Sequence, residues 1–309
     1  MPEGDTIHHL ARRVDAALSG QVIRGAKSGV VAVEASLLVG ARVLGATARA
    51  KHLLVELEGG LVLHVHLGMN GRARVRRRAI DLPPKPSSEE TRVLLWTDSA
   101  TLELVATPIC ELVRADRLEE DPRLARLGKS PLDPDWSSAD IAPAAAALRS
   151  LTNRASIADA LRDQRALSGL GNVLVCEALF AAGADPFASV DAFDDAALEL
   201  VVAVAAAMLR HTSREIRGLP KAPGRITRTD DAAMRGRADP YFVYDRARRP
   251  CVVCGSAVGV RREASESPRL TYHCPRCQPH REGFASRTVP LTPPKLGLMA
   301  RYLRELSRR

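Results

Sequence analysis

Four cysteines between residues 251 and 277 form two Cys-x2-Cys pairs, Cys251 with Cys254 and Cys274 with Cys277. The nineteen residues between the pairs hold two strand-like stretches around a polar segment, which is enough chain for a β-hairpin. Two such pairs on a hairpin can direct four thiolates at one tetrahedral zinc ion. Four thiolates leave no open coordination position, so the predicted zinc ion is structural. Two disulfides, or four unrelated thiols, are the alternatives.

The charge of the chain indicates a polyanionic partner. There are 45 Lys+Arg against 36 Asp+Glu in 309 residues, a formal net charge of +9. An arginine-rich composition alone gives the same total, so the distribution is more informative. Eight basic residues between Arg210 and Arg237 stand among glycines and prolines, as expected for a loop that lies along phosphates.

The sequence favours a cytoplasmic protein without membrane attachment. Residues 1–20 are charged and carry histidines, with no apolar core of a signal peptide. The longest apolar run, 200–209, is about half of a membrane span and predicts a buried helix. Outside the predicted metal site only Cys110 and Cys176 remain, both in apolar stretches, and we expect them to be small buried hydrophobes.

Periodicity divides the chain into a β-rich part and a helical part. Apolar residues at helical spacing predict a helix over 2–19, and the Gly59-Gly60 turn inside HLLVELEGGLVLHVHLG predicts a hairpin. Many short strands up to about residue 113 predict a sandwich or barrel. Further strands are expected at 72–78, 92–97 and 102–106, an acidic, proline-rich linker at 114–138, and helices at 141–150, 156–164, 172–182 and 194–210.

A glycine turn joins two of the predicted helices. Gly169-Leu170-Gly171 is followed by Asn172, a natural N-cap residue for the second helix. The unpaired N–H groups at such a helix start can bind a phosphate, with the Asn side chain beside it. Taken alone the motif is weak, because most turns of this kind only connect helices.

The chain begins Met1-Pro2-Glu3. Removal of Met1 would make the secondary amine of Pro2 the N-terminus, and an α-amino group has a pKa near 8, against about 10.4 for lysine. Roughly a tenth of such an amine is neutral and nucleophilic at pH 7. Its attack on an aldehyde carbon gives a cationic iminium ion, for which Glu3 can shuttle protons. The alternative is an ordinary start without chemical meaning.

Six motifs together resemble the formamidopyrimidine-DNA glycosylase / endonuclease VIII family of base-excision repair enzymes. They are MPEGDT, AKHLLVEL, HLGMNG, LRDQRALSGLGNVLVCEALFAAG, VYDRARRPCVVCG and PRLTYHCPRCQ, and they span roughly residues 2–280. The opening MPEGDT is closer to the endonuclease VIII branch. The resemblance implies an α+β fold with an N-terminal helix and β-sandwich, then a helical domain with a helix-two-turn-helix and a β-hairpin zinc finger. The expected domains are 1–120, a linker at 121–140, the helix-two-turn-helix domain at 141–240, the zinc finger at 241–280 and a tail at 281–309.

The resemblance also implies roles for single residues. Pro2 matches the nucleophile, Glu3 the general acid/base, and Lys51 the lysine beside the lesion. Met69 matches the side chain that fills the void left by an extruded nucleotide, although a core methionine is an equal alternative. The implied phosphate ligands are Asn172 and Arg269.

The expected function is that of a bifunctional DNA glycosylase and AP lyase. It would excise oxidised bases, more readily pyrimidines, from double-stranded DNA by β,δ-elimination, as a monomer in the cytoplasm and on the nucleoid. A catalytically silent damaged-DNA-binding protein on the same scaffold is the alternative, and a zinc-ribbon transcription protein is a third class.

Parts of the chain depart from the family or take no role from it. The stretch VATPICELV lacks the Arg-Phe pair of the formamidopyrimidine branch, which leaves the contact with the opposite base open. His8 and His9 match no family role and are expected to be surface or packing residues. His64 and His66 alternate on one strand face, but no further ligand is evident in the sequence, so no metal is predicted there.

Overall fold

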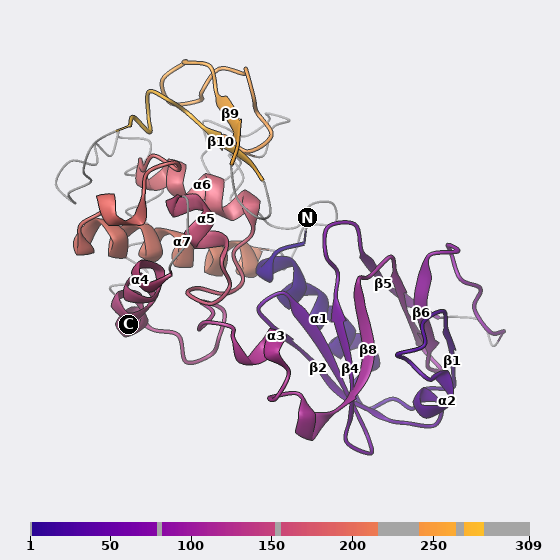
Figure 1. The fold of residues 1–309 in the computed structure, drawn as a ribbon. Helices are drawn as coiled ribbons and strands as arrows, with labels where there is room; N and C mark the ends of the chain where they lie inside the picture. The colour runs from indigo at the N-terminus through magenta and orange to yellow at the C-terminus, as the bar shows by residue number, and fades with distance from the viewer. Residues whose placement is uncertain (1, 79–81, 152–155, 216–240, 264–268, 281–309) are drawn as a thin grey trace. The chain divides into compact units, whose positions relative to one another are not determined.

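The computed structural model describes residues 2–78, 82–151, 156–215, 241–263 and 269–280. The chain divides into two compact units, Met1–Arg126 and Leu127–Arg309. Each unit has its own hydrophobic core. The α+β fold expected from the sequence is confirmed, with a sandwich in the first unit and helices with a hairpin in the second (Figure 1).

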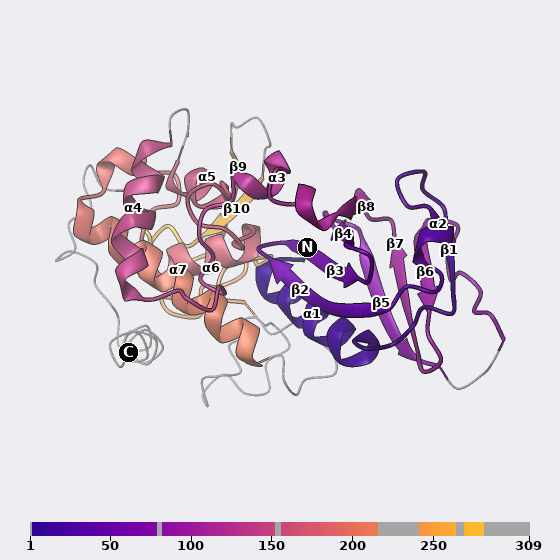
Figure 2. The same ribbon diagram turned by 90° about the horizontal axis from the view of Figure 1, so that it is seen from below.

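The first unit is a β-sandwich of two four-stranded antiparallel sheets, with a long helix packed on it (Figures 1 and 2). The strand orders are β1-β6-β7-β5 and β2-β3-β4-β8. Apolar residues of both sheets and of α1 form one core. The elements are α1 (Gly4–Leu18), β1 (Gly25–Ser28), α2 (Ala35–Leu38), β2 (Val43–Arg49), β3 (His52–Leu57), β4 (Leu61–His66), β5 (Arg72–Arg77), β6 (Thr91–Trp96), β7 (Ala100–Val105), β8 (Ile109–Arg114) and α3 (Pro122–Ala125).

Helix α1 lies against β2 and β3 because one of its faces is apolar. Ile7, Val14 and Leu18, which recur at helical spacing, are almost completely buried. Asp15 ties the helix to the sheet, since its Oδ1 accepts the backbone N–H of Ala46 at 3.1 Å. The predicted helix is therefore confirmed, and its packing on the sheet fixes the position of the residues that precede it.

The predicted hairpin is β3 and β4, joined through Gly59 and Gly60 with φ angles of 87° and 75°. These left-handed angles favour glycine, and the turn sets His52 opposite His66 across the two strands. The strands expected at 72–78, 92–97 and 102–106 are also confirmed, as β5, β6 and β7.

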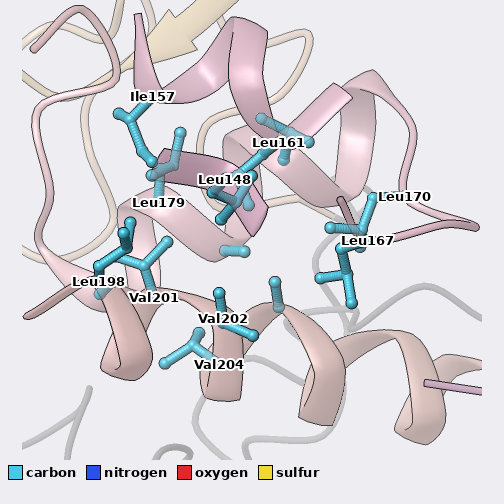
Figure 3. Close-up of a cluster of buried hydrophobic side chains, with 14 of the residues drawn as sticks. Leu148, Ile157, Leu161, Leu167, Leu170, Leu179, Leu198, Val201, Val202 and Val204 are labelled. Carbon is cyan, nitrogen blue, oxygen red and sulfur yellow. The ribbon is translucent and has the colours of Figure 1, made fainter. Parts of the chain in front are cut away.

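In the part of the second unit that the structure describes, four α-helices pack around a core rich in leucine, valine and alanine. Figure 3 shows some of its leucines and valines. Helix α7 is long and apolar enough to cross a membrane by composition alone, but most of its apolar window is buried in this core. It is the buried helix predicted from the run 200–209. Trp136, in the stretch expected to be a linker, also packs into this core. The helices are α4 (Ile141–Ser150), α5 (Ile157–Arg162), α6 (Asn172–Ala182) and α7 (Asp195–Glu215).

A small two-stranded hairpin, β9 (Gly259–Arg262) and β10 (Leu270–His273), lies beside α5 and α6 in both views (Figures 1 and 2). Its own apolar content is small. Cys176 and Phe180 of α6 supply one side of its core, together with Val243, Val258 and two of the paired cysteines. Glu177 of α6 accepts three consecutive backbone N–H groups, those of residues 242–244, at 2.8 to 2.9 Å. The hairpin module is therefore anchored on α6.

Candidate active site and nucleic-acid interface

Pro2 and Glu3 stand immediately before the first turn of α1. Glu3 is the N-cap residue of the helix, with an extended backbone, and its carbonyl accepts the N–H of Ile7 at 3.1 Å. The residue is 1% exposed. A carboxylate at a helix N-terminus is stabilised by the partial positive charge of the helix dipole. A buried acid is thus held one residue from the candidate nucleophile, while Met1 lies outside the described residues.

Lys51 occupies the tight turn between β2 and β3. The turn has two residues, Ala50 and Lys51, between the paired residues Arg49 and His52. Ala50 is buried and has a φ of 52°, a left-handed conformation that is uncommon for a residue with a side chain. The half-buried Lys51 is therefore presented by a short, constrained connection rather than by a long loop.

Three histidines lie together beside Lys51. The rings of His64 and His66 both contact His52, with centroid separations of 5.0 and 4.8 Å, so these side chains share one face as predicted. His52 Nδ1 is 2.8 Å from His64 Nε2, and His64 Nδ1 is 2.9 Å from a carboxylate oxygen of Glu111. Because a carboxylate only accepts, His64 carries its proton on Nδ1 and receives a hydrogen bond from His52.

Burial keeps this cluster uncharged. Burial, together with the neighbouring imidazoles, lowers the pKa of His52 to about 3. Burial and the Lys51 ammonium lower the pKa of His66 to about 4. The backbone N–H of Gly68 donates to His66 Nδ1 at 3.1 Å, so the neutral ring of His66 carries its proton on Nε2. Sequence reasoning did not assign these histidines to the site.

Arg123 occupies the carboxylates that could otherwise bind a metal ion beside His64. Glu111 and Asp121 supply the further candidate ligands that the sequence did not reveal, and the three ligand atoms lie within 4.8 Å of one another. Both carboxylates are paired with the guanidinium of Arg123, however. The ion pairs with Arg123 lower the pKa of Asp121 to about 2. The positive charge at this point is therefore already supplied by an arginine.

Met69 lies in the connection between β4 and β5 and is 57% exposed. The alternative of a core methionine is therefore wrong. The connection is tight, because the N–H of Gly71 donates to the carbonyl of Leu67 at 2.9 Å. A Cβ at position 71 would stand 2.1 Å from that carbonyl oxygen, so the turn requires glycine. A rigid turn thus presents an apolar side chain to solvent.

The stretch VATPICELV forms the end of β7, a short connection and β8. Only Ala106, Thr107 and Pro108 lie between the two strands, and Ala106 has a φ of 52°. This connection is too short to extend a loop away from the sandwich.

Asn172 is the first residue of α6, and Gly171 is the N-cap, so the predicted capping role of Asn172 is wrong. Its side chain points to other partners. Oδ1 accepts from Arg162 Nε at 2.9 Å, and Nδ2 donates to the carbonyl of Leu270 at 2.9 Å. The glycine turn is braced by Gln164, whose Oε1 accepts the N–H of Gly169 at 2.9 Å.

Arg269 directly precedes Leu270 at the start of β10 and is half-buried. Since Asn172 bonds to the Leu270 carbonyl, the second unit brings these two predicted phosphate ligands close together. Of the predicted basic segment, Arg210 donates to the carbonyl of Pro131 at 2.9 Å. The segment from residue 216 to 237 and the tail 281–309 lie outside the described residues.

The four paired cysteines converge at the base of the hairpin. Cys251 Sγ is 3.9 Å from Cys277 Sγ, and Cys254 Sγ is 3.4 Å from Cys274 Sγ, too far for disulfides of about 2.05 Å. A tetrahedral ion with metal–sulfur bonds of about 2.3 Å requires edges of about 3.8 Å. Backbone N–H groups of Val253 and Cys277 point at sulfurs, as in metal-binding turns. The donor set fits one ion, and the buried Cys110 and Cys176 are not among the sulfurs grouped there.

Comparison with known proteins agrees with this arrangement. A family model described as the formamidopyrimidine-DNA glycosylase N-terminal domain matches residues 1–107. The chain is 36% identical over 279 residues to a Streptomyces coelicolor protein named probable endonuclease 8 2, covering 90% of this chain and 94% of the relative. The chain belongs to the formamidopyrimidine-DNA glycosylase / endonuclease VIII family of DNA repair glycosylases.

Other members of the family match over similar lengths. The formamidopyrimidine-DNA glycosylase of Gluconobacter oxydans is 34% identical, covering 78% of this chain and 84% of that protein. The structure of the Thermus thermophilus MutM (Fpg) protein superposes with a TM-score of 0.69 at 29% identity, covering 90% and 98% of the two chains. The Lactococcus lactis enzyme, solved with DNA that contains an abasic site, has the same fold, with a TM-score of 0.71 at 20% identity.

Proposed function

We propose that this protein is a bifunctional DNA glycosylase and AP lyase that uses Pro2 as its nucleophile. The observation that carries the proposal is the pairing of Pro2 with the buried acid Glu3 at the start of α1, in a chain of this family. The substrate is double-stranded DNA that contains an oxidised base or an abasic site, a proposal supported by relatives crystallised with such DNA.

The reaction begins at the ring nitrogen of Pro2. Its neutral amine attacks C1′ of the damaged nucleotide, and the base leaves with the electron pair of the N-glycosidic bond and takes up a proton. Glu3 accepts the proton of the new ammonium and returns it to O4′ as the sugar ring opens. The nitrogen lone pair becomes part of a C=N bond, which gives a cationic iminium.

The iminium then serves as an electron sink for strand cleavage. Loss of a C2′ proton expels the 3′ phosphate, and loss of a C4′ proton then expels the 5′ phosphate, which leaves a one-nucleotide gap. Water hydrolyses the iminium and restores Pro2. Lys51, held by the constrained β2–β3 turn, contacts the DNA beside the lesion, where its ammonium offsets phosphate charge.

Extrusion of the damaged nucleotide costs a few kcal/mol. We assign the phosphate contacts that offset this cost to Asn172 and Arg269. Asn172 bonds to the carbonyl of Leu270, the residue after Arg269, and both side chains can donate to phosphates. Met69, apolar, exposed and carried on a rigid turn, is suited to fill the space that the extruded nucleotide leaves in the stack. The second and third fillers of the formamidopyrimidine branch have no counterpart on the short β7–β8 connection.

We further assign one zinc ion to the four cysteines at the base of the hairpin. The thiolate set and its spacing fit zinc better than a hard cation, which prefers oxygen ligands. When bound, the ion holds the two Cys-x2-Cys turns together and supplies no reaction step. The hairpin can then present Arg269 in a fixed position.

Oxidised pyrimidines are the preferred substrates in this proposal. The opening MPEGDT and the 36% identity to a protein named endonuclease 8 support that branch, whereas relatives named formamidopyrimidine-DNA glycosylase are 30 to 34% identical. Cleavage of duplexes that each carry one defined oxidised base tests the preference. Faster excision of oxidised purines than of oxidised pyrimidines would overturn it.

Reductive trapping tests the nucleophile. With an abasic-site duplex and borohydride, the iminium should be reduced to a stable crosslink that mass spectrometry locates on the nitrogen of Pro2. Pro2→Gly should slow base removal and strand cleavage without unfolding the protein, and a form that retains a blocked N-terminus should give no crosslink. A crosslink on another residue, or an equal crosslink yield from the protein with a blocked N-terminus, refutes the assignment of Pro2 as the nucleophile. Tight binding without any crosslink would instead indicate a catalytically silent damage-binding protein.

A further inference from the structure

A buried ion pair joins α5 to the metal-binding hairpin. Arg162, the last residue of α5, and Glu263, the residue after β9, have side chains that are 12% and 4% exposed, with Nη1 and Oε1 2.8 Å apart. The Glu263 carboxylate also accepts from Ser156, the N-cap residue of α5, at 3.0 Å, and from Thr271 of β10. The pair is therefore the centre of a hydrogen-bonded group rather than an isolated contact.

The guanidinium of Arg162 divides its nitrogens among three partners. Nη1 donates to Glu263, Nη2 donates to Thr271 Oγ1 at 2.5 Å, and Nε donates to Asn172 Oδ1 at 2.9 Å. A guanidinium is planar and its donors have fixed directions, so the three partners constrain one another. The position of the Asn172 side chain is thereby tied to both strands of the hairpin.

These contacts decide the orientation of the Asn172 carboxamide. Arginine can only donate, so the atom facing it must be Oδ1, and the carbonyl of Leu270 can only accept, so Nδ2 must face the hairpin. Of the two N–H groups of Nδ2, the Leu270 carbonyl takes one, and the second is the group that would donate to a phosphate. A flipped carboxamide would place Nδ2 against the Arg162 N–H and Oδ1 against the Leu270 carbonyl oxygen, which are two repulsive contacts.

The backbone of Arg269 is bonded to the same group of residues. It precedes Leu270, and its carbonyl accepts the N–H of Glu263 at 3.1 Å. Asn172 and Arg269, which are distant in sequence, are thus connected by a chain of contacts. Asn172 bonds to Arg162, Arg162 pairs with Glu263, and Glu263 bonds to the Arg269 backbone. We propose that Arg162 is a positioning residue for DNA binding, which holds Asn172 in its donating orientation and couples it to the hairpin. This inference rests on the proposed role of Asn172 as a phosphate ligand.

A purely structural role is the alternative, because loss of one member of a buried ion pair leaves an uncompensated charge. Arg162→Lys separates the two roles. The lysine ammonium can still pair with Glu263, but it has no planar fork with which to hold Asn172 at the same time. Arg165→Lys is the matched control, since Arg165 is half-exposed and pairs with Asp163 in the same segment.

The experiment measures the affinity of the full-length, metal-loaded protein for a duplex with a stable abasic-site analogue. Asn172→Ala should weaken binding about 10-fold, the loss expected for one hydrogen bond to a charged group. Arg162→Lys should weaken it comparably, with unchanged metal content, while Arg165→Lys should bind as wild type does. The double variant Arg162→Lys/Asn172→Ala should be no weaker than Asn172→Ala alone. In single-turnover excision, Arg162→Lys should raise the half-saturating enzyme concentration and leave the maximal rate unchanged.

The outcomes separate this inference from the proposed function. Wild-type affinity in Arg162→Lys, or losses that add in the double variant, would overturn the positioning role while leaving Asn172 as a ligand. Wild-type affinity in Asn172→Ala would remove Asn172 from the interface, and Arg162 with it. The nucleophile Pro2 is tested independently by borohydride trapping.

Discussion

The buried histidine cluster should make the first unit sensitive to acid. In the folded unit the pKa of His52 is lowered to about 3, with burial as the largest cause, whereas an unfolded chain gives about 6.5. A group with a depressed folded pKa binds protons preferentially in the unfolded state below pH 6.5. Stability contributed by neutral His52 is therefore present at pH 7.5 and is lost as the pH falls from about 6.5 toward 3.

The magnitude follows from linkage. At pH 5 an unfolded histidine with a pKa of 6.5 gains about 2 kcal/mol from protonation, and folded His52 gains almost none. At pH 7.5 the difference is about 0.1 kcal/mol. His52 alone should therefore lower the unfolding free energy of the first unit by about 2 kcal/mol between pH 7.5 and pH 5.

Each unit contains one tryptophan, so tryptophan fluorescence can follow the unfolding of each unit separately. Trp96 lies in β6 of the first unit and Trp136 packs in the core of the second, so Trp136→Phe leaves Trp96 as the reporter. Urea unfolding followed at pH 7.5 and pH 5 should show a smaller acid loss in His52→Phe than in its parent, by about 2 kcal/mol. His280→Phe, in the second unit, is the control and should match the parent. Equal acid losses in His52→Phe and the parent would refute the claim that burial keeps His52 neutral.

Two further predictions concern the hairpin. Cys277→Ser should abolish stoichiometric metal binding and weaken DNA binding, because it removes one of four thiolates; full metal occupancy by elemental analysis would contradict the four-thiolate site. Arg269→Ala should weaken damaged-DNA binding about 10-fold and reduce the slope of log affinity against log salt by about 0.9, with metal content unchanged. Loss of metal in Arg269→Ala would indicate a structural role instead.

Local sequence signals predicted the elements whose pattern is complete within a short window. The helix that became α1 followed from apolar periodicity, and those that became α4, α5, α6 and α7 followed from alanine-rich stretches. The β3–β4 hairpin followed from its two glycines. That hairpin also fixes which residues face each other, so the contact of His52 with His66 could have been derived from the turn alone. Individual strand pairings such as β4 with β8 could not, because they join segments more than forty residues apart.

The candidate site shows the same division. The cysteine spacing alone predicted a metal-binding site, and the structure places the four sulfurs close enough to hold one ion. Glu111 and Asp121 beside His64, and Glu263 beside Arg162, depend on folded contacts and have no local pattern. The capping role of Asn172 failed by one position, since glycine in an extended conformation is also among the preferred N-cap residues.

The shared core between α6 and the hairpin has a physiological consequence. Phe180 and Cys176 are covered by a module whose small interior includes the four paired cysteines. A chain synthesised during metal starvation would leave this apolar side of α6 open to water, and we expect it to be recognised by chaperones and proteases. The cellular abundance of this protein, and with it the capacity for DNA repair, would then rise and fall with the metal supply.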